Sequence, residues 1–60
     1  MDAKEYDRIA DLLMQIRKKY VILQPKEEVN QHRKNIAIDY VNALLVLNER
    51  FAERDAAGWL

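Results

Sequence analysis

Apolar residues recur at helical spacing along the first third of the chain. They lie alternately three and four positions apart, which is the a/d pattern that gathers side chains on one stripe of an α-helix. The stripe consists of Tyr6, Ile9, Leu13, Ile16, Tyr20 and Leu23. Neighbouring apolar positions widen it to an arc of roughly 200°. We therefore predict a first helix over about residues 2–23, with Asp2 as its N-terminal cap and Pro25 preventing its continuation.

A second, denser apolar segment covers residues 36–47 and predicts a second helix over about residues 25–57. Pro25 suits the first position of a helix, where an amide hydrogen has no intrahelical partner. Gly58 suits the left-handed residue that follows a helix C-terminus. The stretch 24–35 contains Val29 as its one large apolar residue, so it is either a continuous part of this helix or a bend. The two helices would form an antiparallel hairpin.

Both apolar arcs are wider than one hairpin can bury, since the second helix has an arc of roughly 220°. If the hairpin stayed alone, Ile38, Val41 and Leu45 would lie in an exposed apolar patch. We therefore predict an all-α fold in which two hairpins pair into a homodimeric four-helix bundle. A higher oligomer and a compact monomer with a middle helix over 25–34 are the alternatives. The predicted core and dimer interface contains Ile9, Leu13, Ile16, Ile38, Val41, Leu44, Leu45 and Phe51.

Composition limits what this single domain of residues 1–60 can do. The chain contains no Cys, Ser or Thr, so it has no disulfide, no thiolate metal ligand and none of the commonest nucleophilic side chains. No apolar run approaches the roughly 18 residues of a membrane span. Acids rather than bases lie near the N-terminus, unlike in a signal peptide. We expect a cytoplasmic protein that is not an enzyme and needs no cofactor.

Titratable side chains give no convincing reactive cluster. His32 and Glu28 are four residues apart on one helix face, but a tight metal site needs three or four ligands. Asp39 and Asn42 line up with the polar stripe, so exposure is favoured over a buried role in an oligomer. Paired acids also fall on polar stripes, namely Asp7 with Asp11 and Glu49 with Glu53. We predict no catalytic, cofactor-binding or metal-binding residues.

Charge is distributed unevenly although its sum is zero. Residues 12–34 contain six cations and two acids, whereas residues 1–11 and 35–60 each contain two cations and four acids. A hairpin would therefore be basic at its turn and acidic at its termini. The candidate surface for an anion or a partner consists of Arg17, Lys18, Lys19, Lys26, Arg33 and Lys34. Trp59, next to Gly58, is a candidate anchor that either packs on the second helix or binds a partner.

These patterns favour a small interaction module that regulates or assembles a larger protein partner, in the manner of an inhibitor or an adaptor. The alternative function is an RNA- or DNA-binding regulator that uses the basic turn. Dedicated nucleic-acid-binding proteins usually carry a net positive charge, and this chain carries none. We therefore expect a second copy of the chain and an unidentified protein as partners, with nucleic acid less favoured and no membrane.

Overall fold

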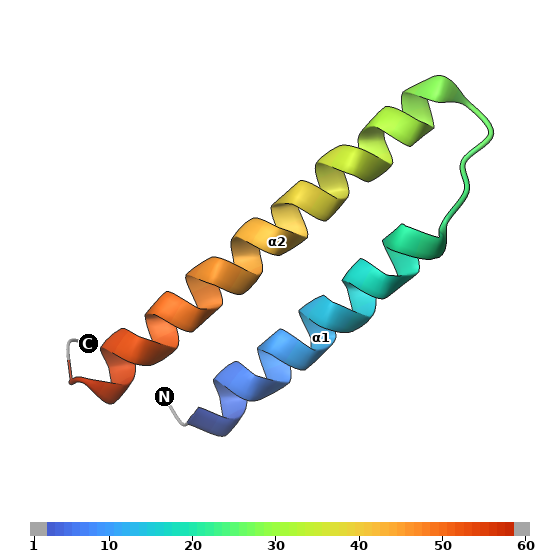
Figure 1. Cartoon of the computed structure of the whole chain (residues 1–60). Helices are drawn as coiled ribbons and strands as arrows, with labels where there is room; N and C mark the ends of the chain where they lie inside the picture. Colours follow the sequence, from blue (N-terminus) through green and yellow to red (C-terminus); the bar gives the residue numbers. More distant parts are fainter. Residues whose placement is uncertain (1–2, 59–60) are drawn as a thin grey trace.

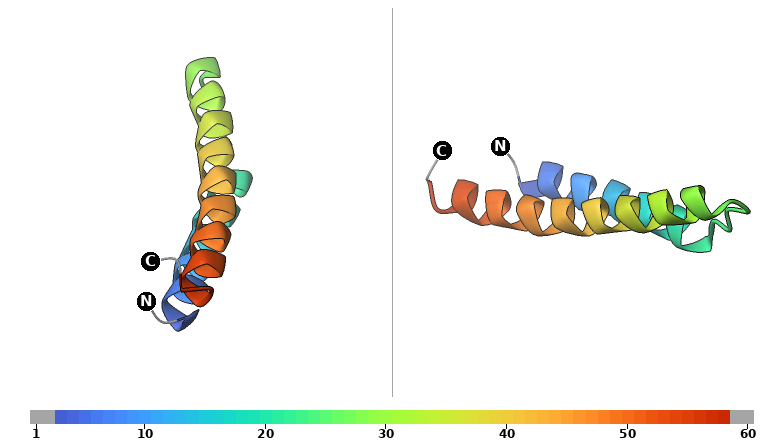
Figure 2. Two further views of the ribbon diagram at one scale, coloured as in Figure 1. Left: turned by 90° about the vertical axis from the view of Figure 1, so that its left-hand side faces the viewer. Right: turned by 90° about the horizontal axis from the view of Figure 1, so that it is seen from above.

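The computed structural model of the chain is an antiparallel hairpin of two helices (Figure 1). It describes residues 3–58, of which α1 spans Ala3–Ile22 and α2 spans Glu28–Ala56, with no strand in this range. The Cα atoms extend over 47 × 16 × 10 Å, so the hairpin is a flat rod with two broad faces (Figure 2). The predicted helical hairpin is confirmed. The predicted helix start at Asp2 lies outside the described residues.

Pro25 is not the first residue of the second helix, and this part of the prediction is wrong. It lies in the connection over 23–27, and α2 begins only at Glu28, after Glu27 in an extended conformation (φ −92°, ψ 141°). The reason is geometric: the chain must cross the 8–10 Å that typically separate packed helix axes, and a helix starting at Pro25 would leave only Leu23 and Gln24 to do so. The acids Glu27 and Glu28 still lie at the helix N-terminus, where its dipole favours negative charge.

α2 is continuous from its first residue to its last, so residues 28–35 are helical and show no bend. No separate middle helix over 25–34 is present among residues 3–58. At 1.5 Å per residue, α2 is about 44 Å long and α1 about 30 Å. Within residues 3–58, neither helix has a segment that meets the length and hydropathy of a membrane span.

The C-terminus of α2 ends as the glycine predicts. Gly58 has a φ of +77°, and its amide donates a hydrogen bond to the Asp55 carbonyl oxygen at 3.1 Å. The left-handed conformation lets this amide turn back on the last helical turn, which a residue with a Cβ adopts only with strain. The predicted C-terminal cap is therefore confirmed. The predicted anchor Trp59 lies outside the described residues.

The two helices meet along a seam in which small and polar side chains alternate with larger ones. Tyr6 and Val41 are less than one-tenth exposed, and no other described residue is buried to that degree. The remaining seam residues are half-buried; they are Ala10, Leu13, Arg17, Tyr20, Lys34, Ala37, Ile38, Leu45, Asn48, Ala52 and Asp55. The seam of α1 follows the predicted stripe only at Tyr6, Leu13 and Tyr20, because Ala10 and Arg17 replace Ile9 and Ile16.

The expectation that Ile38, Val41 and Leu45 would be exposed in a lone hairpin is also wrong. Val41 is 7% exposed, and Ile38 and Leu45 are half-buried against α1. An arc of more than 200° contains more than one stripe that could face the neighbouring helix, and periodicity alone does not choose between them. The side of α2 that faces α1 also carries Asn48 and Asp55, which are hydrogen-bonded to Tyr6 of α1.

Candidate interaction surface

One broad face of the hairpin is apolar along its length, beginning with a stripe on α1. Ile9, Ile16 and Leu23 repeat every seven residues, which is close to two helical turns, so they lie on the same side of the helix. Leu12 lies next to this arc on the helical wheel, on the side away from the seam. Each of the four side chains is at least 40% exposed. The face therefore displays α1 residues that the sequence pattern had placed in the seam.

A matching stripe runs along α2 at spacings of three and four residues. It consists of Ile36, Tyr40, Leu44, Leu47 and Phe51, which are 40–69% exposed. A groove of about 300 Å³ is lined by Ile9 and Leu13 from α1 together with Leu44, Leu47, Asn48 and Phe51 from α2. Because residues of both stripes line this groove, both stripes belong to one face. We call Ile9, Leu12 and Ile16 of α1, Leu23 just after its end, and the five α2 residues the apolar face.

The opposite broad face is mainly polar. Asp39 and Asn42, which the sequence places on the polar stripe, are both exposed, as predicted. Five further exposed apolar residues lie outside the set that defines the apolar face: Met14, Val21, Ile22, Val29 and Val46. They are distributed over both helices, and single surface hydrophobes are common in soluble proteins. The hairpin therefore has one continuous apolar face rather than an apolar surface all round.

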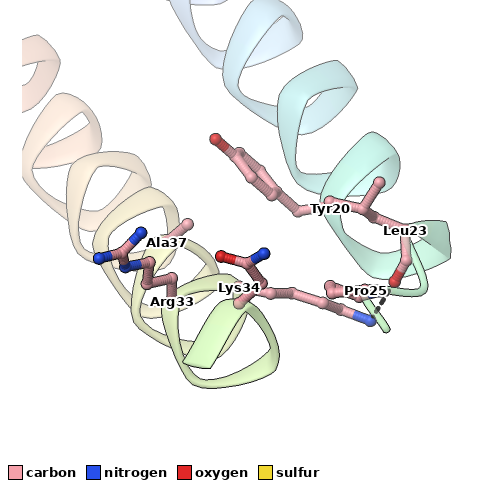
Figure 3. Close-up of a pocket in the computed structure, with 7 residues that line it drawn as sticks. Tyr20, Leu23, Pro25, Arg33, Lys34 and Ala37 are labelled. Atoms are coloured by element: carbon pink, nitrogen blue, oxygen red, sulfur yellow. Dashed lines mark hydrogen bonds between the residues drawn. The ribbon is translucent and has the colours of Figure 1, made fainter. Parts of the chain in front are cut away.

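The apolar face continues to the turn, where it becomes mixed with charged residues. Ile16, Lys19, Tyr20 and Leu23 line a second groove of about 300 Å³. An adjoining groove of about 410 Å³ shares two of these residues, and Figure 3 shows Tyr20 of α1 and Leu23 after its end across the groove from Arg33, Lys34 and Ala37 of α2. Its lining consists of Tyr20, Leu23, Pro25, Asn30, Arg33, Lys34 and Ala37.

The structure places the six candidate cations in different surroundings. The Lys34 ammonium donates hydrogen bonds to the carbonyl oxygens of Leu23 (2.7 Å) and Val21 (3.3 Å), and so caps the C-terminal end of α1 (Figure 3). Arg17 is half-buried in the seam, and its Nε atom has no hydrogen-bond partner among the described residues. Lys18, Lys19, Lys26 and Arg33 are exposed. Only four of the six predicted residues are therefore displayed at the turn end.

At the other end of the hairpin, Tyr6 of α1 is hydrogen-bonded to Asp55 and Asn48 of α2. The Tyr6 hydroxyl donates to Oδ2 of Asp55 at 3.2 Å, and Nδ2 of Asn48 donates to the Tyr6 carbonyl oxygen at 3.0 Å. Burial raises the pKa of the Tyr6 hydroxyl above its ordinary value of 10.0, and the hydrogen bond to Asp55 and its negative charge raise it further. These contacts hold α1 in a defined register against α2.

The titratable pairs that the sequence places on one helix face are exposed in the structure. His32 and Glu28 are both exposed. The acid pairs formed by Asp7 with Asp11 and by Glu49 with Glu53 are also exposed. Within residues 3–58, no group of three or more His, Cys, Asp or Glu side chains is placed to hold a metal ion.

Comparisons with protein-family models, with curated proteins and with solved structures find no match to this chain. Five residues of the apolar face were absent from the predicted interface: Leu12, Leu23, Ile36, Tyr40 and Leu47. The signal that could have identified the three α2 members is the regular spacing of positions 36, 40, 44, 47 and 51.

Proposed function

We propose that this protein is a non-enzymatic helical interaction module that self-associates. Two hairpins pair through their apolar faces into a homodimeric four-helix bundle, and this bundle regulates or assembles a larger protein partner. The single observation that carries the proposal is the continuous apolar face, which holds nine large side chains that are each at least 40% exposed. Soluble monomers rarely expose an apolar patch that extends over most of one side.

The weakness of the hairpin core supports the same proposal. Only Tyr6 and Val41 are less than one-tenth exposed among the described residues, whereas a sixty-residue domain needs most of its large apolar side chains buried to be stable. The intrachain seam contains Ala10, Ala37 and Ala52, so larger residues are left outside. In a four-helix bundle these larger residues would form the central core, and the present seam would become the contact between neighbouring helices.

The experiment that tests the proposal compares two charge insertions on the same helix. Leu44, on the apolar face, and Val46, on the far side of α2, are both 50% exposed. Leu44→Glu would place an unpaired charge in the dimer core and should abolish pairing, whereas Val46→Glu should leave it unchanged. Light scattering after gel filtration at about 50 μM should give twice the 7.1 kDa chain mass for the wild type and Val46→Glu. A wild-type monomer, or equal effects of the two substitutions, would contradict the proposal.

A further inference from the structure

We propose that the occupant of the apolar face is a second copy of this chain in antiparallel orientation, with Glu5 of each copy beside the partner's Lys19. The turn of one hairpin then lies next to the helix termini of the other. This inference rests on the proposed function, since it specifies how the two hairpins pair. It adds the orientation, the two-fold axis and the charged contact that selects them.

The dimensions of the hairpin fit a second copy. Its broad side measures 47 Å by 16 Å between Cα atoms, which corresponds to about 750 Å². A stable interface of standard size buries about 800 Å² on each partner. One broad face of the hairpin thus matches one side of such an interface, and a second identical face covers it from end to end.

The apolar stripes are arranged as antiparallel self-pairing requires. When a helix packs antiparallel on its own copy, residues at equal distances before and after the two-fold axis meet. On α2, Leu44 has Tyr40 and Leu47 on either side of it, followed by Ile36 and Phe51, so apolar residues face apolar residues about an axis near Leu44. On α1, an axis near Leu12 lies at the middle of the helix, and Ile9 and Ile16 flank it.

The ends of the hairpin differ in charge, and this difference selects the antiparallel arrangement. Residues 12–34, which include the turn, contain six cations and two acids, and the segments at the other end are acidic. A parallel pair would place two basic turns side by side and two acidic ends side by side. An antiparallel pair places a basic turn beside an acidic end twice, and such complementarity orients protein association.

Glu5 and Lys19 provide the specific contact. Both are exposed, and helical periodicity puts Glu5 on the side of α1 that carries Ile16 and Leu23, while Lys19 lines the groove that contains those two residues. They lie seven residues before and seven residues after Leu12. With the two-fold axis near Leu12, Glu5 is therefore level with the partner's Lys19, and symmetry repeats the contact at the other end.

A distance measurement decides the orientation. The chain has no cysteine, so Lys26→Cys introduces one spin-label site in the exposed connection. At 1.5 Å per residue from an axis near Leu44, the two labels of an antiparallel dimer should be about 50 Å apart. A parallel dimer should give less than about 25 Å, since its turns are adjacent helix neighbours. Asp11→Cys, near mid-length, is the control, because its distance is similar in either orientation.

A charge exchange tests the Glu5–Lys19 contact itself. Glu5→Lys and Lys19→Glu each create two like-charge pairs and should weaken the dimer roughly fivefold to tenfold at low salt. The double exchange should restore the dissociation constant to within about twofold of the wild type. Each substitution also places an unfavourable charge at one end of the α1 dipole. These two unfavourable contributions would add in the double variant and weaken the dimer further. Recovery of the dissociation constant therefore requires a direct contact between the two positions.

The outcomes separate the two proposals. A wild-type dimer with the long Lys26 distance and recovery in the double exchange supports the antiparallel pairing. A dimer with the short Lys26 distance, or one in which the two exchanges add, overturns the pairing and leaves the proposed function intact. A monomer in light scattering overturns both.

Discussion

The polar side chains between the helices define how α1 lies against α2. Tyr6 is 8% exposed and contacts Asp55 through its hydroxyl, while its carbonyl oxygen accepts a hydrogen bond from Asn48. These bonds require particular residues to be opposite one another, whereas apolar contacts tolerate sliding by a turn. Because an unsatisfied buried polar group is costly, a shift in register would be opposed at this end of the hairpin.

The raised pKa of Tyr6 predicts a specific pH dependence. The folded protein holds the hydroxyl proton more tightly than the unfolded chain does, so this stabilisation is complete below pH 10.0 and is lost as the pH rises through the higher folded-state pKa. Tyr6→Phe should therefore lose less stability than the wild type between pH 9 and about pH 12. Thermal melts followed by circular dichroism would measure this. Below about pH 9 the difference in stability between the two proteins should stay constant, and this range is the internal control.

At the scale of the helical element, the C-terminus of α1 is capped by a side chain of α2. Its C-terminal carbonyls are near the turn and receive the Lys34 ammonium of α2, which supplies both hydrogen bonds and a positive charge where the helix dipole favours one. The connection over 23–27 can then leave α1 without orphaned carbonyls at Val21 and Leu23. A side chain of α2 thus caps the C-terminus of α1. The path of the connection over 23–27 therefore depends on how the two helices pack.

Replacing this cap should destabilise the hairpin measurably. Lys34→Met keeps much of the aliphatic stem but removes the donor, so we expect a loss of about 1 kcal/mol in the free energy of unfolding. Lys26→Met removes an exposed cation from the same end and should change stability by less than about 0.5 kcal/mol. Urea denaturation followed by circular dichroism would compare the two variants. Equal stabilities would show that the Lys34 hydrogen bonds contribute nothing.

At the scale of the whole molecule, the hairpin is flat, with one apolar and one mainly polar side. A Cα thickness of about 10 Å leaves no space for an interior remote from solvent, which is why half-burial is the usual state of its apolar residues. Pairing through the apolar face would double this thickness and create a true core. The proposed dimer is therefore also the proposed source of most of the stability of the fold.

Coupled folding and pairing predict a melting temperature that depends on concentration. Raising the chain from 1 to 100 μM should stabilise the folded dimer by about 2.7 kcal/mol. For two sixty-residue chains this corresponds to an increase of roughly 10 °C in Tm. Circular dichroism in cells of different path length would measure it, with Leu44→Glu as the matched variant expected to show no such increase. A wild-type Tm that is independent of concentration would mean that the hairpin unfolds as a monomer.

Sequence periodicity alone determined that the chain forms two helices joined near Pro25 and that Gly58 ends the second one, because helix propensity, prolines and glycines act locally. It also showed that both helices carry more apolar surface than a hairpin can bury. Tertiary structure decided which stripe faces inward: Arg17 and Ala10 lie in the seam in place of Ile16 and Ile9. It also decided that the Lys34 ammonium caps the C-terminus of α1. Both outcomes depend on hydrogen bonds and close contacts between residues up to 49 positions apart, which a repeat of three and four residues does not encode.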